Sequence, residues 1–291
     1  MSDTKGLFFT KMEGAGNDYV YIDALGSPTS VDVEAVNLPE LAIKISNRHF
    51  GVGGDGLIII LPSHNADFRM RMFNADGSEA QMCGNGSRCV AKYVHDKGFT
   101  DKTTFTLETL AGIKTLTVHL VNGVTDEVTV DMGKATLKRG EIPVTGDAAD
   151  LMIDGLVKIE DKNFEITAVG MGNPHGVIFV DEITDRHIHH YGKILETADI
   201  WPQKANIEFV EVVDRNHINM RVWERGSGET LACGTGACAS VVAAVTKGLT
   251  DTDVDVKLLG GTLHISYDSE TQNVKMRGPA RFVAEGNYFV N

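Results

Sequence analysis

The sequence predicts an α+β protein built from two similar domains. The chain has 291 residues, and because a domain usually holds about 100–200 residues, two domains are expected. Short runs of β-branched and apolar residues recur along the chain and end at Gly, Asn or Asp, which is typical of strands. Few stretches have helical periodicity, and one long helix is expected in each half. The same order of motifs also occurs twice.

The expected strands are short and are separated by turn residues. They are Tyr19–Asp23, Leu57–Leu61, Arg69–Phe73, Thr103–Leu107, Thr115–Leu120, Glu127–Asp131, Val177–Val180, Glu208–Val213, Asn219–Trp223, Thr262–Tyr267 and Asn273–Met276. Apolar residues recur with helical spacing in three stretches, Leu38–Ser46, Ser87–Lys97 and Ala237–Lys247. Near the C-terminus, Met276–Val283 is expected to return to the first domain as an added strand.

An internal repeat relates the two halves. Met70–Gly86 can be placed over Met220–Gly236 at an offset of 150 residues without a gap. In both copies a Cys-Gly-x-Gly motif comes just before a helix-like stretch. Upstream, Gly14–Asn17 and Gly170–Asn173 each precede an apolar run that ends at Asp. Two occurrences of the order Gly-Asn, strands, Cys-Gly-x-Gly and helix indicate two homologous domains.

The repeat predicts where the domains begin and end. The first domain is expected to hold residues 1–130 plus 278–291 and carries Cys83, and the second is expected to hold residues 131–277 and carries Cys233. A pseudo-twofold axis between such domains would bring the two helix starts to face each other across a cleft. Because pockets form preferentially at domain interfaces, the active site is expected there.

Composition excludes several classes of function. The formal net charge is -13, which argues against nucleic-acid or anionic-membrane partners, because phosphate contacts need clustered Lys and Arg. The longest apolar run, near Leu57–Leu61, is far shorter than the ~18 residues of a membrane helix. The N-terminus has no signal-peptide pattern, so a cytoplasmic location is expected. Four cysteines in such a chain favour catalytic or metal-binding roles over disulfides. Whether the protein forms a homodimer stays open.

Cys83 and Cys233 are the candidate catalytic residues. Each stands just before a predicted helix, whose first turn presents unpaired N–H groups and a partial positive charge. That environment is expected to favour thiolate and to lower the thiol pKa. The adjacent glycines let a ligand approach the backbone, and the same N–H groups can hold a carboxylate. A thiolate on one face of an α-carbon and a thiol on the other would invert the centre as paired base and acid.

The other two cysteines are expected to have a packing role. Cys89 and Cys238 fall inside predicted helices, where a free Cys behaves as a small buried hydrophobe. The pairs Cys83/Cys89 and Cys233/Cys238 lack the short spacing of zinc ligands, and no His cluster completes either set. No metal site is therefore expected.

Six segments give the chain a resemblance to the diaminopimelate epimerase family over essentially its whole length. In order they are KMEGAGNDYVYID, RHFGVGGDGLI, FNADGSEAQMCGNGSRC, GMGNPHGVIFVD, ANIEF and WERGSGETLACGTGAC, and the two that contain cysteines are highly specific. The resemblance implies two similar domains, each a curled, mostly antiparallel sheet around a central helix. It also implies interconversion of LL- and meso-diaminopimelate without pyridoxal phosphate, metal or another cofactor, in lysine and peptidoglycan precursor synthesis in the cytoplasm.

The resemblance assigns roles to individual residues. Cys83 and Cys233 would be the acid–base pair. The reacting α-carboxylate would be held by the backbone of Gly84, Asn85, Gly234 and Thr235, with the Thr235 hydroxyl. The distal end of the substrate would be held by Asn17, Asn74, Asn173, Asn206 and Arg225, since an Arg fork suits a carboxylate and Asn both donates and accepts. His175 and Glu224 would touch the reacting amino group or tune the thiols. One position departs from the pattern, because Gly56 stands where some relatives carry a longer polar side chain.

Two alternatives stay open at this point. Proline racemase and hydroxyproline epimerase resemble this fold and also use two cysteines, but Asn74, Asn206 and Glu224-Arg225 suit a second amino-acid head that proline lacks. A thiol redox switch or binding module without turnover belongs to a different class. It predicts that one cysteine could be lost without abolishing any catalytic step.

Overall fold

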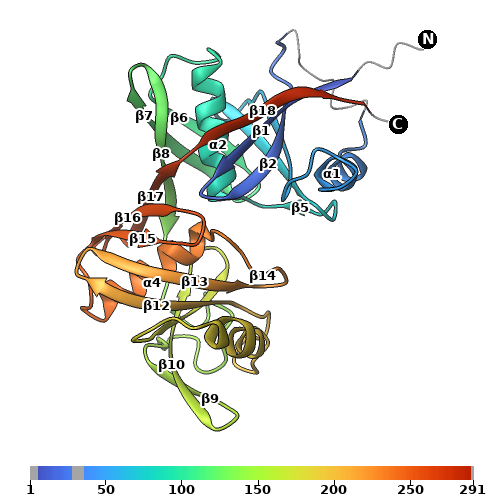
Figure 1. Ribbon diagram of the computed structural model, residues 1–291. Coiled ribbons are helices and arrows are strands. Elements are labelled where there is room, and N and C mark those ends of the chain that lie inside the picture. The colour runs from blue at the N-terminus through green and yellow to red at the C-terminus, as the bar shows by residue number, and fades with distance from the viewer. Residues whose placement is uncertain (1–5, 28–35, 290–291) are drawn as a thin grey trace. The chain divides into compact units, whose positions relative to one another are not determined.

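The computed structural model describes residues 6–27 and 36–289. The chain divides into two compact units, drawn in Figure 1. Unit 1 comprises Met1–Val130 and Gly278–Asn291, and unit 2 comprises Asp131–Arg277. No helix among the described residues has the length and apolar character that crossing a membrane requires.

In its described residues, unit 1 is a single run of hydrogen-bonded strands with two helices. Its elements are β1 (Leu7–Gly14), β2 (Asn17–Asp23), α1 (Leu38–Ser46), β3 (Gly56–Leu61), β4 (Phe68–Asn74), β5 (Glu79–Ala80), α2 (Gly84–Asp96), β6 (Thr104–Thr109), β7 (Gly112–Val121), β8 (Val124–Lys134), which continues into unit 2, and β18 (Arg281–Tyr288). The strand order is β18-β1-β2-β3-β4-β6-β7-β8, with β5 beside β4. Only the β2–β3 and β4–β6 pairs of this run are parallel.

Unit 2 has a similar composition. Its elements are β9 (Gly155–Ile159), β10 (Lys162–Gly170), β11 (Pro174–Phe179), the π-helix η2 (His187–Gly192), α3 (Lys193–Glu196), β12 (Asn206–Asp214), β13 (His217–Glu224), β14 (Gly228–Glu229), α4 (Gly234–Thr246), β15 (Asp253–Lys257), β16 (Thr262–Asp268) and β17 (Asn273–Pro279). The order is β9-β10-β11-β12-β13-β15-β16, with β14 beside β13, and β17 follows β16. The β11–β12 and β13–β15 pairs are parallel.

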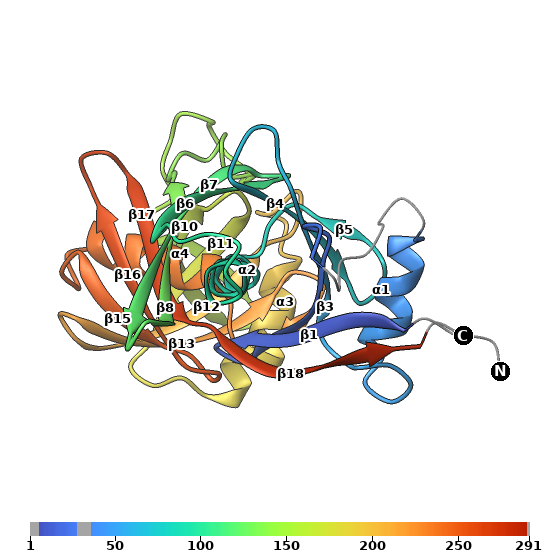
Figure 2. The same cartoon turned by 90° about the horizontal axis from the view of Figure 1, so that it is seen from above.

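The two orders match strand for strand, including the positions of the parallel pairs. In each unit the long helix follows the short strand, β5 or β14, and precedes the strand that pairs in parallel, β6 or β15. Figure 2 looks along α2, which is seen end-on inside strands of unit 1; α2 contacts β1, β2 and β7, and α4 contacts β10–β13, β15 and β16. The repeat in the sequence is therefore a repeat in the fold, and the predicted α+β class is confirmed.

The three expected helices are present, but two begin earlier than predicted. Helix α1 has the predicted bounds, and the Asn37 side chain caps it by accepting a hydrogen bond from the Glu40 backbone N–H at 3.4 Å. Helices α2 and α4 begin at Gly84 and Gly234, directly after the cysteines. The apolar periodicity of the sequence does not extend into this first turn, because the Gly residues in it give no apolar signal.

The strand predictions are confirmed where they were made, but several strands were missed. The predicted return of the C-terminal segment is confirmed, because β18 pairs antiparallel with β1 from Leu7↔Tyr288 to Glu13↔Arg281, as Figure 1 shows. Strands β1, β9, β10 and β15 were not predicted, and the predicted C-terminal strand, Met276–Val283, covers only the end of β17 and the first three residues of β18. Alternation is weak in β18, whose residues are exposed or half-buried throughout, so its place in the sheet rests on backbone pairing rather than on an apolar face.

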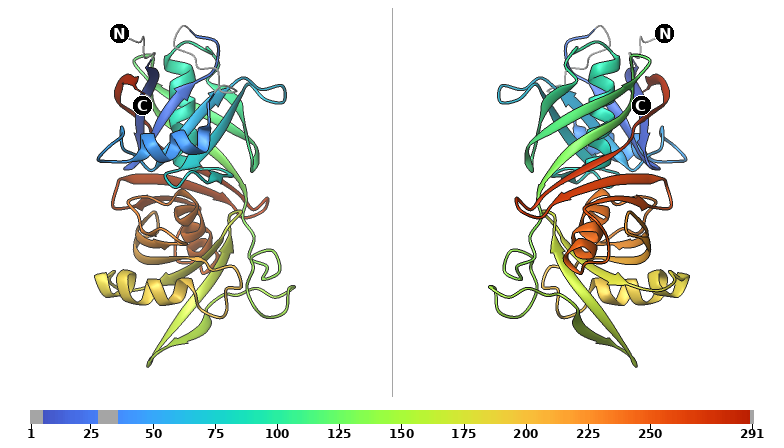
Figure 3. Two further views of the ribbon diagram at one scale, coloured as in Figure 1. Left: turned by 90° about the vertical axis from the view of Figure 1, so that its right-hand side faces the viewer. Right: turned by 90° about the vertical axis from the view of Figure 1, so that its left-hand side faces the viewer.

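Each unit also packs short helices against the outside of its sheet. In unit 1, Leu41 and Ile45 of α1 join a core with residues of β2 and β3. In unit 2, Ile188 and Leu195 of η2 and α3 join a core with residues of β10 to β12. Figure 3 shows η2 and α3 beside the sheet and the β9–β10 hairpin projecting from unit 2. The long helix and the short helices thus cover opposite faces of the sheet in each unit.

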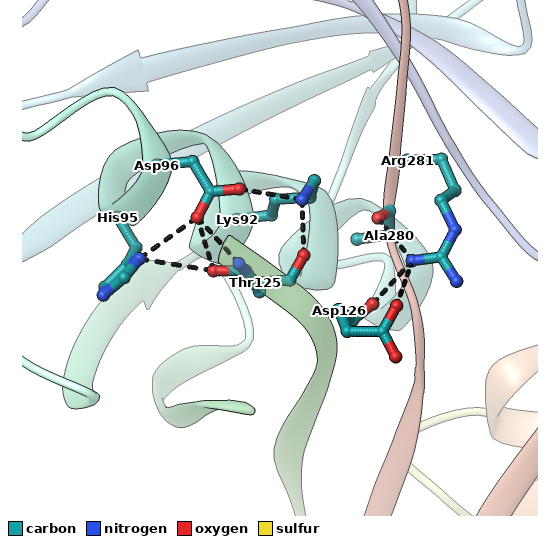
Figure 4. Close-up of polar contacts among 7 residues, drawn as sticks. All are labelled: Lys92, His95, Asp96, Thr125, Asp126, Ala280 and Arg281. Atoms are coloured by element: carbon teal, nitrogen blue, oxygen red, sulfur yellow. Dashed lines mark hydrogen bonds and ion pairs between the residues drawn. The ribbon is translucent and has the colours of Figure 1, made fainter. Parts of the chain in front are cut away.

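A polar cluster fixes the C-terminal end of α2 to the start of β8 (Figure 4). The Lys92 ammonium lies 2.7 Å from Asp96 Oδ2, and it also donates to the Thr125 carbonyl oxygen. Asp96 Oδ1 accepts from the Thr125 backbone N–H at 3.1 Å and from the Thr125 hydroxyl at 2.7 Å. Burial alone would raise the pKa of Asp96, but hydrogen bonds from Lys92, Thr125 and His95 outweigh it and lower that pKa.

Asp96→Asn is expected to lower the free energy of unfolding by roughly 2 kcal/mol near neutral pH, because it weakens hydrogen bonds to a charged, mostly buried group. The folded-state pKa of Asp96 is lowered, so its stabilisation is present above the unfolded pKa of about 3.9 and is lost as pH falls through the folded value. Urea unfolding at several pH values should show the difference between variant and parent narrowing below about pH 4. Asp126→Asn is the matched control, because its ion pair with Arg281 is half-exposed. A loss of unfolding free energy in Asp126→Asn as large as that in Asp96→Asn would contradict this account.

Candidate active site

Cys83 caps the first turn of α2. Its backbone is extended, with φ -133° and ψ 119°, and its sulfur accepts a hydrogen bond from the Gly86 backbone N–H at 3.4 Å. The thiol donates to Asn17 Oδ1, which lies 3.3 Å from the sulfur. Asn17 is the first residue of β2. The structure therefore brings together two predicted site residues, Cys83 and Asn17, that are 66 positions apart in the sequence.

A charged network holds the Asn17 side chain. Asn17 Nδ2 donates to Asp55 Oδ2 at 2.7 Å, and because a carboxylate only accepts, this contact turns Asn17 Oδ1 toward Cys83. Arg48 contacts both Asp55 and Asp18, at 2.9 Å and 2.8 Å. Burial and the nearby Asp18 raise the pKa of Asp55. Asp55 was not predicted as a site residue, and its only signal in the sequence was the GGDG turn that contains it.

Asn85 is buried, and its side chain is already engaged. Its Oδ1 accepts a hydrogen bond from Arg88 Nη1 at 2.8 Å, and Arg88 Nε donates to the Pro279 carbonyl oxygen at 3.0 Å. Arg88 is fully buried, and burial lowers the pKa of its guanidinium. The side chain of Asn85 thus anchors the first turn of α2, through Arg88, to the chain near β18.

The remaining predicted residue of unit 1, Asn74, lies at the end of β4. It faces Gly56 of β3 in the antiparallel pair, and its Nδ2 donates to the Ser78 hydroxyl at 3.0 Å in the turn that follows. A Cβ atom added to Gly56 would lie 2.1 Å from the Phe73 carbonyl oxygen. The backbone here leaves no room for a longer side chain at position 56.

Cys233 caps α4 in the same way as Cys83 caps α2. Its backbone is extended, its sulfur accepts from the Gly236 N–H at 3.4 Å, and the Thr235 hydroxyl lies 3.6 Å from the sulfur. Burial raises the pKa of the Cys233 thiol well above its usual value, and the carboxylates of Glu224 and Glu208 raise it further. The expectation that the helix N-terminus lowers the thiol pKa is therefore wrong for Cys233, because burial and two acidic neighbours outweigh the helix.

His175 and Asn173 lie beside this cysteine within unit 2. The imidazole Nδ1 lies 2.7 Å from Glu208 Oε1, and Nε2 lies 2.9 Å from Asn173 Oδ1. Asn173 Nδ2 in turn donates to the Thr235 hydroxyl at 3.4 Å. Three predicted residues, His175, Asn173 and Thr235, thus form one hydrogen-bonded chain that ends near the Cys233 sulfur. Glu208 completes it and was not predicted, because its position in a strand of apolar residues gave no functional signal.

Three further predicted residues of unit 2 are Asn206, Glu224 and Arg225. Asn206 Nδ2 donates to the Pro174 carbonyl oxygen at 3.0 Å, and Asn206 Oδ1 accepts from the Arg225 backbone N–H at 2.9 Å. Burial raises the pKa of Glu224, although a hydrogen bond from Thr230 opposes this. The Arg225 side chain is exposed, and its Nη1 lies 3.2 Å from the Gln203 carbonyl oxygen. Asn206 therefore fixes the backbone that carries Arg225.

Each half-site consists of a cysteine at a helix start and an asparagine that begins or precedes the neighbouring strand. Cys89 and Cys238 lie inside α2 and α4 and are buried, and burial raises the pKa of Cys89 to about 12, which keeps it a thiol. Among residues 6–27 and 36–289, no group of three or more His, Cys, Asp or Glu side chains is arranged to hold a metal ion. Cys83 and Cys233 stand instead at matched helix starts, each with a glycine N–H donating to its sulfur.

The fold is shared with several solved structures. A phenazine biosynthesis protein of the PhzF family from Bacillus anthracis matches with a TM-score of 0.68 and 18% identity, over 98% of this chain and 100% of that chain. A hydroxyproline epimerase from Agrobacterium vitis matches with a TM-score of 0.66 and 14% identity, over 97% of this chain and 90% of that chain. The protein therefore has the PhzF and proline racemase-like epimerase fold.

Sequence similarity narrows this class to one family. The family model described as diaminopimelate epimerase matches residues 9–138 and 167–283. A diaminopimelate epimerase of Methanococcus maripaludis is 50% identical over 278 residues, which cover 96% of this chain and 98% of that protein. One from Acetivibrio thermocellus is 48% identical over 283 residues, which cover 97% and 99%. The chain belongs to the diaminopimelate epimerase family.

Proposed function

We propose that this protein interconverts LL- and meso-diaminopimelate by a two-cysteine acid–base reaction that uses no pyridoxal phosphate. The relatives that are about half identical to the chain over nearly its full length are named diaminopimelate epimerase. The observation that carries the proposal is the pair of cysteines at matched helix starts, each with a glycine N–H donating to its sulfur at 3.4 Å. We place the reaction in the cytoplasm, where lysine and peptidoglycan precursors are made.

The chemistry balances with two sulfur atoms. One cysteine, as thiolate, removes the α-proton and becomes a thiol, while the other gives its thiol proton to the opposite face of the carbon and becomes a thiolate. Negative charge that develops on the α-carboxylate is stabilised by helix N–H groups at Gly84, Asn85, Gly234 and Thr235. The proposal requires both sulfurs to reach the same carbon.

The distal amino-acid head accounts for the remaining predicted residues. Its ammonium and carboxylate suit Asn17, Asn74, Asn173 and the Arg225 fork, with Asn206 holding the backbone of Arg225 at 2.9 Å. Glu224 lies on the Cys233 side and suits the reacting ammonium, whereas His175, whose two ring nitrogens both contact residues of this unit, suits the tuning of the Cys233 thiol. Proline has no second head, so this set of polar groups favours diaminopimelate over proline and hydroxyproline.

An exchange assay tests the proposal directly. Purified protein is incubated in deuterated water with LL-diaminopimelate and no added cofactor, and NMR follows loss of the α-proton signal and appearance of the meso isomer. We expect exchange with LL-diaminopimelate and none with L-proline under the same conditions. Exchange with proline alone would support the alternative racemase. A protein that exchanges neither substrate but changes its thiol content with oxidant would support the redox switch.

A further inference from the structure

A fully buried charged pair lies under the Cys233 half-site. The side chains of His175 and Glu208 are both 0% exposed, and Nδ1 and Oε1 are 2.7 Å apart. They stand on neighbouring parallel strands, β11 and β12, where His175 faces Asn206 and Gly176 faces Ile207. Glu208 Oε2 has no hydrogen-bond partner among the residues that the structure describes. Its charge therefore needs compensation from His175.

The two neighbours of His175 decide its protonation. Glu208 Oε1 and Asn173 Oδ1, at 2.7 Å and 2.9 Å, are both acceptors. With Glu208 ionised, a neutral imidazole could donate to only one of these two oxygens, so contact with both favours the doubly protonated form. Asn173 Nδ2 then faces Thr235 and donates to its hydroxyl. That leaves the Thr235 O–H free to donate to the Cys233 sulfur, 3.6 Å away.

The equivalent place in unit 1 is apolar. A Cβ added to Gly236 would lie 2.8 Å from Glu208 Oε1, whereas a Cβ added to Gly86 would lie 2.7 Å from Cδ1 of Ile58. The third residue of α4 therefore stands over a carboxylate, and the third residue of α2 stands over isoleucine. Since isoleucine fills this place in unit 1, packing alone does not require a buried carboxylate, and its cost points to a role in the reaction.

We propose that Glu208 is a positioning residue that keeps His175 doubly protonated and so directs the Thr235 hydroxyl, through Asn173, to donate to the Cys233 thiolate. This inference rests on the proposed function, because only an acid–base cysteine must exist as both thiolate and thiol. When Cys233 is a thiol, the chain reverses at Thr235, whose oxygen accepts from S–H. The buried pair of His175 and Glu208 thus supports a hydrogen bond between Thr235 and Cys233 in both the thiolate and the thiol state.

The charges around His175 are consistent with this role. Glu208 contacts it from β12, and Glu224, at the end of β13, interacts with it electrostatically. Glu208 and Glu224 both oppose a thiolate at Cys233. An imidazolium at His175, 2.7 Å from Glu208, would offset part of the charge of that carboxylate.

NMR of the ring nitrogens of His175 tests the proposal in the intact protein. Long-range ¹H–¹⁵N spectra distinguish an imidazolium from either neutral tautomer, and His175→Gln assigns the signals. We expect an imidazolium in the parent protein between pH 6 and 8, the range in which an ordinary histidine, with a pKa of about 6.5, deprotonates. Glu208→Gln should convert it to a neutral ring at pH 8, and Glu208→Asp, which retains the charge, should keep the imidazolium. A neutral His175 in the parent protein, or an imidazolium that survives Glu208→Gln at pH 8, would overturn the proposal.

Activity gives a second readout that a packing defect would not reproduce. Glu208→Gln should lower kcat by about tenfold at pH 8, the loss of one hydrogen bond to a charged group. Activity should recover as pH falls, because protonation of His175 restores the donor at Thr235. Thr235→Val removes that donor directly, so His175 should remain an imidazolium in this variant. Adding Glu208→Gln to Thr235→Val should then cause no further loss of kcat. Additive losses would contradict the chain, and if Glu208→Gln fails to fold, the parent spectrum and Thr235→Val still decide. An inactive parent protein would contradict the proposed function, whatever the NMR result.

Discussion

Cys83→Ala and Cys233→Ala are each expected to abolish epimerisation. Either change removes the acid or base on one face of the α-carbon, and positioned acid–base groups contribute about 10²–10⁴-fold to the rate. Both sulfurs occupy the same place at the start of a helix, with the N–H of Gly86 or Gly236 at 3.4 Å, so neither can replace the other. Cys→Ser at either position should leave slow turnover, since a hydroxyl is a much weaker acid and base. Formation of meso-diaminopimelate measured by chiral chromatography checks this.

The two packing cysteines supply the control for these variants. Cys89→Ala and Cys238→Ala remove thiols that are buried inside α2 and α4, so we expect near-normal kcat with some loss of thermal stability from the cavity. The mechanism would be refuted by full activity in Cys83→Ala or Cys233→Ala. It would also be weakened if Cys89→Ala abolished turnover while the protein remained folded.

Arg88→Met is expected to lower the free energy of unfolding by about 2–4 kcal/mol, because removing this buried donor leaves two buried acceptors without it. The guanidinium is fully buried and donates to the Pro279 carbonyl oxygen at 3.0 Å and to Asn85 Oδ1 at 2.8 Å. Methionine fills similar volume but donates no hydrogen bond, so both acceptors lose this donor in the interior. Denaturant unfolding followed by circular dichroism measures the loss.

Arg71→Met is the matched control for Arg88→Met. Arg71 pairs with Glu79 at 2.7 Å, but both side chains are about one-third exposed, and exposed ion pairs contribute only about 0–1 kcal/mol. We expect the free energy of unfolding of this variant to lie within about 1 kcal/mol of the parent value. Equal losses in the two arginine variants would show that the burial of Arg88 has no special importance for unit 1.

The local parts of the site could be predicted from the sequence. Cys83 and Cys233 were identified because a Cys-Gly-x-Gly motif followed by helical periodicity is a contiguous signal, and the N-cap geometry that it indicates depends on neighbouring residues alone. The 150-residue offset between the motifs predicted the repeated strand order. The full extent of a strand of weak alternation, such as β18, could not be predicted, since its place depends on backbone pairing with β1.

The partners of the cysteines could not be predicted in the same way. Asp55 reaches Asn17 across 38 positions, and Glu208 reaches His175 across 33. Both contacts form because parallel strands stand side by side, β2 with β3 and β11 with β12. A carboxylate in an apolar strand gives no sign in the sequence of the imidazole that it will meet.

The sequence by itself determined the two-unit α+β fold, the family and the two sulfur atoms. Only the tertiary structure decided the direction in which the pKa of the Cys233 thiol shifts. Burial and two carboxylates raise this pKa, whereas the helix start alone would lower it. Helix capping and strand periodicity are local, so they can be read from neighbouring residues. Burial and charge act through space, so they exist only once distant strands have paired.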